Sequence, residues 1–323
     1  MSFLKFPYFI LRHLNTAVFQ GRNQTRNYFE GWYMKQVSDD GSFYFAVIPG
    51  IALDKNGNGH AFIQLIEGES DHTEYIRYEL SDFDFELNTF RGRIGSNTFR
   101  FDGLELDLTE KGIPFQAKLS FDFPKVDPSW WISPGRVNWY SWLPGMQCYH
   151  LVVSPFHHVK GTVKLNGNTY TFNKGHGYIE KDYGRSFPNS WIWLQCNNFG
   201  MDEASIMYSE GDVVWAGVKF RGFICTLICN GKSYLFATYT TARVRHFSDK
   251  NGLLKIRITS SKYVLDISAN GDTGGILRAP VDGQMKRDIL ETLHAEVNIK
   301  FCTRQNELIY EGKGTRAGFE VVH

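Results

Sequence analysis

Hydrophobic positions along the chain follow the two-residue period of β-strands rather than the 3.6-residue period of α-helices. After residue 20, short segments rich in Tyr, Phe, Val, Ile and Thr alternate with clusters of Gly, Asn and Asp. Segments 43–48 and 61–66 each follow such a cluster. The pattern therefore predicts an all-β protein in which most strands are connected by hairpins.

Asn-Gly dipeptides mark several of the expected turns. Asn166-Gly167 and Asn230-Gly231 each separate two strand-like segments by two residues. Both central residues of a type I′ turn need positive φ, so Asn-Gly is a strong hairpin signal. The many hairpin strands in each half fit an up-and-down barrel or a sandwich, and the pattern alone does not separate the two.

A segment in the middle of the chain is expected to join two β units. Five of the ten prolines and four of the eight tryptophans fall within residues 124–155. Proline cannot donate a hydrogen bond within a central strand, so this segment is predicted to be irregular. We expect its tryptophans to fill one unit or to pack between both. The predicted domains are residues 1–155, which include this joining segment, and residues 156–323, with a short helix or arm at the N-terminus.

Composition and charge narrow the function classes. The length of 323 residues suits two domains, and 42% hydrophobic residues exclude a disordered chain. A net charge of +1 without a basic patch argues against nucleic acid as a partner. Five cysteines require no disulfide scaffold, and Arg12 and His13 interrupt the apolar N-terminal segment that a signal peptide would need. We expect a cytoplasmic protein, with peripheral contact to a membrane as a further option and the oligomeric state open.

The densest group of chemically useful residues lies between 175 and 199. If this segment begins as a strand, Tyr178, Glu180 and Asp182 share one face. Two carboxylates on one strand face indicate either a solvated face or the lining of a cavity.

The following strand, expected over residues 190–198, alternates strongly. One face is apolar, and the other combines two indoles with two amides: Trp191, Trp193, Gln195 and Asn197. Such a mixed face is typical of a ligand cavity, although indoles also serve simple packing.

A second candidate acid lies near the first predicted strand. Glu30 and Trp32 share a face within an aromatic segment. Glu30 is either a pocket acid with a raised pKa or a structural anchor paired with a cation. Cys225 and Cys229 lie too far apart for a Cys-x-x-Cys chelate, and we expect no metal site.

Three blocks, at residues 28–35, 177–197 and 274–282, resemble the tocopherol cyclase family of plants and cyanobacteria. More distantly, the chain is similar to carotenoid hydratases and other lipocalin-like enzymes. This resemblance implies two lipocalin-like β-barrel domains packed together. It therefore favours a barrel over a sandwich.

The resemblance also implies an activity, that of an intramolecular cyclase, which is an isomerase. The enzyme would protonate a prenyl double bond so that a phenol oxygen closes a chromanol ring, without a redox cofactor or metal. Its substrate would be a small hydrophobic molecule, a prenylated aromatic compound or another isoprenoid. A carboxylic acid that is desolvated in an apolar barrel stays protonated near neutral pH and can act as the donor.

Site residues follow from the same resemblance. Glu180 is the first choice for the acid because related hydratases use an acid two residues after a tyrosine, here Tyr178. Asp182 is the second choice. Trp191 and Trp193 would stabilise the cation through their aromatic faces.

Further residues would bind the substrate. Gln195 and Asn197 would orient the quinol head, while Glu30 and Trp32 would line the site from the other domain. Plant members carry Asn-Trp-Gly where this chain has Asp-Tyr-Gly at 182–184, which leaves the substrate open. The alternatives are a related alkene hydratase, a non-catalytic lipid-binding protein of the same fold, and a carbohydrate-binding protein.

Overall fold

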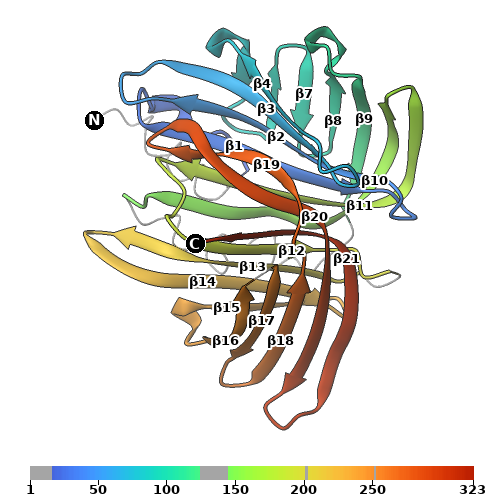
Figure 1. Cartoon of the computed structure of the whole chain (residues 1–323), viewed down its shortest axis with the longest axis vertical. Helices are drawn as coiled ribbons and strands as arrows, with labels where there is room; N and C mark the ends of the chain where they lie inside the picture. The colour runs from blue at the N-terminus through green and yellow to red at the C-terminus, as the bar shows by residue number, and fades with distance from the viewer. Residues whose placement is uncertain (1–16, 124–144, 201–202, 251) are drawn as a thin grey trace. The chain divides into compact units, whose positions relative to one another are not determined.

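The computed structural model describes residues 17–123, 145–200, 203–250 and 252–323. The expected N-terminal helix or arm and the four tryptophans of the joining segment lie outside these residues. Contact clustering divides the chain into two compact units. Each unit contains one antiparallel β-sheet with its own core (Figure 1).

The described residues confirm the all-β fold. Their helical elements are short 3-10 turns: η1 (Gly21–Asn23), η2 (Leu80–Asp82), η3 (Thr109–Lys111) and η5 (Thr238–Thr240). In this part of the chain, no helix has the length and apolar character needed to cross a membrane.

The first unit contains an eleven-stranded sheet in the order β4-β3-β2-β1-β11-β10-β9-β8-β7-β6-β5. The bounds are β1 (Tyr28–Val37), β2 (Tyr44–Leu53), β3 (Gly59–Glu67), β4 (Thr73–Tyr78), β5 (Phe83–Phe85), β6 (Arg91–Ile94), β7 (Asn97–Arg100), β8 (Gly103–Asp107), β9 (Phe115–Asp122), β10 (Cys148–Leu165) and β11 (Asn168–Gly184).

The first sheet curls so that its two edges approach each other. The edge strands β4 and β5 are consecutive in the chain, and Asn97 Nδ2 donates a hydrogen bond to Tyr78 Oη at 3.1 Å. Alternate side chains from every strand fill the interior, with Trp32, Phe45 and Phe115 among the largest. Within the described residues, this wrapping buries one apolar face of the sheet without a helix layer.

The second sheet has ten strands, of which β15-β14-β13-β12-β21-β20-β18-β17-β16 are neighbours and β19 pairs with β20. The bounds are β12 (Trp191–Cys196), β13 (Ser205–Trp215), β14 (Val218–Cys229), β15 (Lys232–Ala237), β16 (Arg243–Lys250), β17 (Leu253–Thr259), β18 (Tyr263–Asn270), β19 (Gly275–Val281), β20 (Gln284–Thr303) and β21 (Leu308–Val322). Ile192, Leu194 and Cys196 point into the core of this unit, as their alternation indicates.

Both Asn-Gly hairpins form as expected. Asn166 and Gly167 have φ of 51° and 83°, and they connect β10 to β11. Asn230 and Gly231 have φ of 50° and 69°, and they connect β14 to β15. Asparagine tolerates the left-handed region better than other non-glycine residues, which explains its place in these turns.

Contact clustering assigns the residues on both sides of the expected boundary, 155 and 156, to the first unit. That boundary falls inside β10. Residues 66–73 and the segment from Pro188 to Leu277 belong to the second unit. Residues 278–287 then return to the first unit. The hairpin signal joins β10 to β11, but only the long-range pairing of β11 with β1 assigns both strands to the first sheet.

Candidate functional site

The first two sequence blocks that carry the family resemblance form adjacent strands. β1 pairs antiparallel with β11, which places Tyr33 opposite Glu180 and Gly31 opposite Asp182. Residues far apart in the chain thus form one continuous surface on the first unit.

The third block reaches the same region through backbone hydrogen bonds. Phe187 N donates to Pro280 O at 3.1 Å, and Asp282 N donates to Ser186 Oγ at 2.7 Å. The segment that follows β11 is therefore held by the end of β19, and parts of all three blocks (residues 28–35, 177–187 and 278–282) lie within the first unit.

Tyr178, Glu180 and Asp182 lie on the outer face of the first sheet. Their neighbour Ile179 belongs to the core, and Lys181 Nζ lies 4.9 Å from the ring centroid of the core residue Trp32. Successive side chains of a strand point to opposite faces, so the two carboxyl groups face away from the barrel interior. Alternation in the sequence shows which residues share a face but not which face is internal. Here Glu180 lies on the face opposite the core cluster and is only 4% exposed.

His150 brings the two carboxyl groups into one cluster. It lies on β10 directly opposite Asp182, and its Nδ1 is 3.0 Å from Asp182 Oδ1. Its Nε2 is 3.7 Å from Glu180 Oε2, and Tyr178 Oη donates to the same oxygen at 2.6 Å. We call Tyr178, Glu180, Asp182 and His150 the acid–histidine cluster. Sequence reasoning missed His150, because only the register of β10 against β11 places it there.

Cys148 borders this cluster with its Sγ 3.9 Å from Asp182 Oδ1. Desolvation, together with the nearby Asp182 carboxylate, raises the pKa of the Cys148 thiol well above its usual value. The thiol therefore stays protonated near neutral pH, which argues against a nucleophilic or metal-ligating thiolate.

The acid–histidine cluster also has the geometry of a metal site. Among the described residues, His150, Glu180 and Asp182 each offer a ligand atom, and these atoms lie within 4.8 Å of one another. One imidazole and two carboxylates suit a divalent cation such as Zn²⁺ or Mn²⁺. Glu180 and Asp182 both lie on β11, whereas His150 lies on β10, so local spacing in the sequence indicated the carboxylate pair but not the histidine.

Aromatic side chains surround the cluster on the outer face. The rings of Tyr33 and Tyr178 contact each other edge to face, with centroids 6.5 Å apart. At Gly31, a Cβ would lie 3.8 Å from Phe62 Cζ, and the Phe62 ring stacks on Tyr75 at 5.5 Å. This aromatic surface offers apolar contact, and ring faces that can stabilise a cation, beside the carboxyl groups.

Glu30 lies on the core side of the first sheet, opposite to the face of Glu180. The side chains of Glu30 and Lys181 are fully buried, and Lys181 Nζ is 2.6 Å from Glu30 Oε1. Tyr28 Oη donates to Glu30 at 2.5 Å, and the Gln20 backbone N–H donates at 2.8 Å. These contacts are those of a structural anchor paired with a cation, one of the two interpretations of Glu30 given above.

Trp32 also lies in the core of the first unit. Its ring stacks on Phe85 and Phe90 with centroid distances of 4.6 and 5.5 Å, and its Nε1 donates to Ala17 O at 2.8 Å. The structure thus places Glu30 and Trp32 together, on the opposite face of the sheet from the acid–histidine cluster.

The four predicted residues on β12 and just after it belong to the second unit. Trp191, Trp193, Gln195 and Asn197 are buried and alternate with the core residues of that strand. Trp191 Nε1 donates to Glu320 Oε2 on β21 at 2.6 Å. They therefore share the outer face of the second sheet, as their two-residue spacing predicts.

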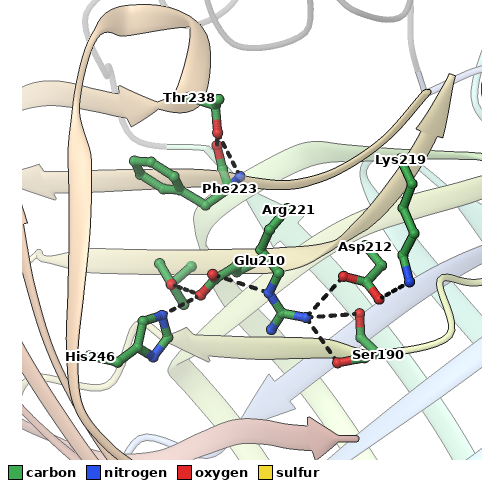
Figure 2. Close-up of polar contacts among 9 residues, drawn as sticks. Ser190, Glu210, Asp212, Lys219, Arg221, Phe223, Thr238 and His246 are labelled. Atoms are coloured by element: carbon green, nitrogen blue, oxygen red, sulfur yellow. Dashed lines mark hydrogen bonds and ion pairs between the residues drawn. The ribbon is translucent and has the colours of Figure 1, made fainter.

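The second unit contains another Tyr-x-Glu-x-Asp sequence, at residues 208–212 on β13. Tyr208 Oη donates to Glu210, whose carboxylate also contacts Arg221 Nε at 3.2 Å and His246 Nε2 at 2.8 Å (Figure 2). Asp212 contacts Lys219 and Arg221 at 3.0 and 3.5 Å. Each carboxylate here contacts a permanent cation, which is typical of a structural ion-pair network.

Fold and site together define an all-β protein of two antiparallel sheets that carries an acid–histidine cluster on the outer face of the first. The family model described as tocopherol cyclase-like matches residues 135–322, and the chain belongs to this family. The match includes the second and third blocks but not the block at residues 28–35.

Two plant proteins are similar over half of this chain. They are the chloroplastic tocopherol cyclase of Zea mays, 23% identical over 172 residues, and the probable chloroplastic tocopherol cyclase of Oryza sativa subsp. japonica, 24% identical over 172 residues. The matched region covers 50% of this chain and 36% of each relative. The match thus spans about a third of the length of these curated relatives.

Solved structures share the fold over nearly the whole chain. Kievitone hydratase from Nectria haematococca has a TM-score of 0.53 at 11% identity, covering 94% of this chain and 93% of that one. CghA with Sch210972 has a TM-score of 0.57 at 10% identity, with 91% and 88% covered. A putative AttH from Nitrosomonas europaea has a TM-score of 0.52 at 14% identity, with 93% of both chains covered.

Proposed function

We propose that the protein is an enzyme that protonates an alkene of a prenylated aromatic compound or a related isoprenoid, as a tocopherol cyclase-like intramolecular cyclase. The observation that carries this proposal is the acid–histidine cluster. In this cluster the Glu180 carboxyl group accepts a hydrogen bond from Tyr178 and lies beside the His150–Asp182 pair. Membership of the tocopherol cyclase-like family supports the same chemistry.

The reaction can be written with every proton accounted for. The Glu180 carboxyl group donates its proton to one alkene carbon, which leaves a tertiary cation on the other carbon. The phenol oxygen of the same molecule then forms the new C–O bond, and the phenol proton passes to His150 or Asp182 and back to Glu180. The substrate is isomerised, and the enzyme returns to its starting protonation state.

The neighbouring groups have distinct roles in this scheme. Tyr178 fixes the orientation of the Glu180 carboxyl group through its hydrogen bond of 2.6 Å. The rings of Tyr33 and Phe62 supply faces that stabilise positive charge, each by about 0.5–2 kcal/mol. No step of this scheme uses a redox cofactor.

Hydration of an alkene is the second candidate function. The His150–Asp182 pair, at 3.0 Å, is an arrangement that can accept a proton from water as well as from a phenol. Water would then add to the cation in place of the phenol oxygen. A solved structure with the same fold is a hydratase, kievitone hydratase.

The test uses prenylated hydroquinones as substrates and mass spectrometry of the products. A cyclase leaves the substrate mass unchanged and introduces one deuterium on carbon when the reaction runs in D₂O, whereas a hydratase adds the mass of water. Glu180→Gln should lower turnover about 10²–10⁴-fold, the usual contribution of general acid catalysis, with little change in substrate affinity. Asp182→Asn should lower turnover less.

Glu210→Gln is the matched control, because Glu210 has the same Tyr-x-Glu-x-Asp context in the second unit. It should leave turnover per folded molecule unchanged, with folding checked by circular dichroism. Turnover that is abolished by Asp182→Asn but not by Glu180→Gln would reverse the assignment within the cluster. Lipid binding without turnover in the wild type would instead identify a carrier protein.

A further inference from the structure

The end of the β13–β14 hairpin extends beyond its neighbouring strands. The ladder between β12 and β13 ends at the pair Trp191–Gly211, and the ladder between β14 and β15 begins only at Ile224. Between these limits, β13 and β14 pair with each other as far as Trp215 and Val218 (Figure 1). A two-stranded ribbon with no sheet on either side is marginally stable in water, so its composition is informative.

One face of this ribbon is entirely apolar. Val213 lies opposite Phe220, and Trp215 lies opposite Val218, so the four side chains project from the same face. Trp215, Val218 and Phe220 are 36%, 62% and 42% exposed. We call these four residues the hairpin apolar face.

The opposite face of the ribbon combines charged residues with Val214, which is 40% exposed and lies opposite Lys219. Lys219 Nζ lies 3.0 Å from Asp212 Oδ2, and Arg221 connects Asp212 to Glu210 and to Ser190 Oγ (Figure 2). The ion pairs connect β13 to β14, and the hydrogen bond of Arg221 to Ser190 connects the hairpin to the residue before β12. Because two carboxylates balance two cations, the ribbon has little net charge.

The turn at the tip differs from the two Asn-Gly hairpins described above. Ala216 occupies the first turn position with φ of 50°, where the hairpins described above have Asn166 and Asn230 at 51° and 50°. Alanine in the left-handed region costs about 1 kcal/mol, yet it removes the polar side chain that these turns otherwise expose. The tip is therefore apolar at the position where a hairpin in water most favours Asn or Asp.

Size and chemistry indicate the partner of this face. A stable protein–protein interface buries about 800 Å² on each side, more than four side chains at a ribbon tip supply. Tryptophan favours the boundary between water and lipid, and a lysine stem can lie along apolar surface while its ammonium group stays hydrated. Lys219, whose side chain is 60% exposed, lies one strand position from the tip.

We propose that the hairpin apolar face inserts into the headgroup region of a lipid bilayer and docks the protein on the membrane surface. Burial of apolar side chains should provide most of the free energy of binding to the bilayer, because the positive and negative charges of the ribbon balance. Binding should therefore occur on zwitterionic vesicles and change little with salt. This proposal does not depend on the reaction proposed above.

The experiment measures co-sedimentation of the full chain with phosphatidylcholine vesicles, with and without phosphatidylglycerol. Replacing both Trp215 and Val218 by Ser should weaken binding at least about tenfold, given the apolar area withdrawn from lipid. Leu308→Ser is the matched control, because Leu308 is 57% exposed on another hairpin of the same unit, and it should change binding less than twofold.

A second readout locates the contact. Vesicles with a quencher in the acyl chains should quench part of the tryptophan fluorescence, and Trp215→Phe should remove that part while binding persists.

Three outcomes would overturn the proposal: no binding to either vesicle, equal loss of binding in the Leu308 control, or binding that requires anionic lipid and disappears in salt. Self-association that the double variant abolishes would instead identify a second copy of the chain as the partner.

Discussion

The buried ion pair between Glu30 and Lys181 provides a sharp test of the fold. Both side chains are fully buried, and Lys181 Nζ also donates to Val18 O. We consider Lys181→Met, which keeps an unbranched side chain of similar length but removes the charge. The variant leaves the Glu30 carboxylate in the core without this counter-charge, although it still accepts from Tyr28 Oη.

The size of the effect follows from this geometry. Removing one partner of a buried ion pair costs about 3–5 kcal/mol, because the remaining charge stays desolvated. The contact between Lys181 Nζ and the Trp32 ring, at 4.9 Å, adds to the loss. For a unit of this size, each kcal/mol lowers the melting temperature by about 2–4 °C, so we expect a decrease of about 6–20 °C.

The assay is thermal and urea unfolding of wild type, Lys181→Met, Glu30→Gln and the double variant. The double variant should be more stable than either single variant, because it leaves no uncompensated buried charge. Arg185→Met is the matched control: its partner is Asp282 at 3.3 Å, and both side chains are more than half exposed. That exposed pair should contribute about 0–1 kcal/mol.

Two results would refute this reasoning. If Lys181→Met lowers stability no more than Arg185→Met, the pair is not desolvated as the structure shows. If the two single effects simply add in the double variant, the two side chains are not coupled. A large loss of ligand affinity in a folded Glu30→Gln variant would instead support a role of this acid in substrate binding.

Three further predictions concern buried polar groups. Gly177→Ala should destabilise the first unit by about 1–3 kcal/mol in urea unfolding, since its Cβ would lie 2.1 Å from His157 Nε2 and 2.6 Å from Gln36 Oε1. Burial lowers the pKa of His157 from 6.5 to about 3. Between these two pH values, His157 is protonated in the unfolded chain but neutral in the folded chain. Stability should therefore fall as the pH falls from about 6.5 towards 3, and His157→Gln should flatten that slope in unfolding measurements at several pH values. Trp191→Phe should cost about 1–3 kcal/mol, because Glu320 loses a buried donor at 2.6 Å, and a melting temperature equal to that of the wild type would contradict this contact.

Local sequence signals determined the type of each element and the grouping of side chains. The alternation at residues 178–182 and 191–197 correctly placed Tyr178 with Glu180 and Trp191 with Trp193, because the period of a strand is always two. The Asn-Gly pairs located two hairpins, because few residues accept positive φ. These features depend on neighbours within a few residues, and the sequence alone determined them.

The tertiary structure decided which face of each strand is internal and which strands meet. Glu30 and Glu180 both follow a tyrosine by two residues, yet β1 points Glu30 into the core and β11 points Glu180 outward. His150 joins the carboxyl groups only through the register of β10 against β11. Likewise, only the tertiary structure shows that β11 pairs with β1 across about 150 residues of chain. Long-range pairing depends on how the whole apolar surface is buried at once, and no local pattern contains that information.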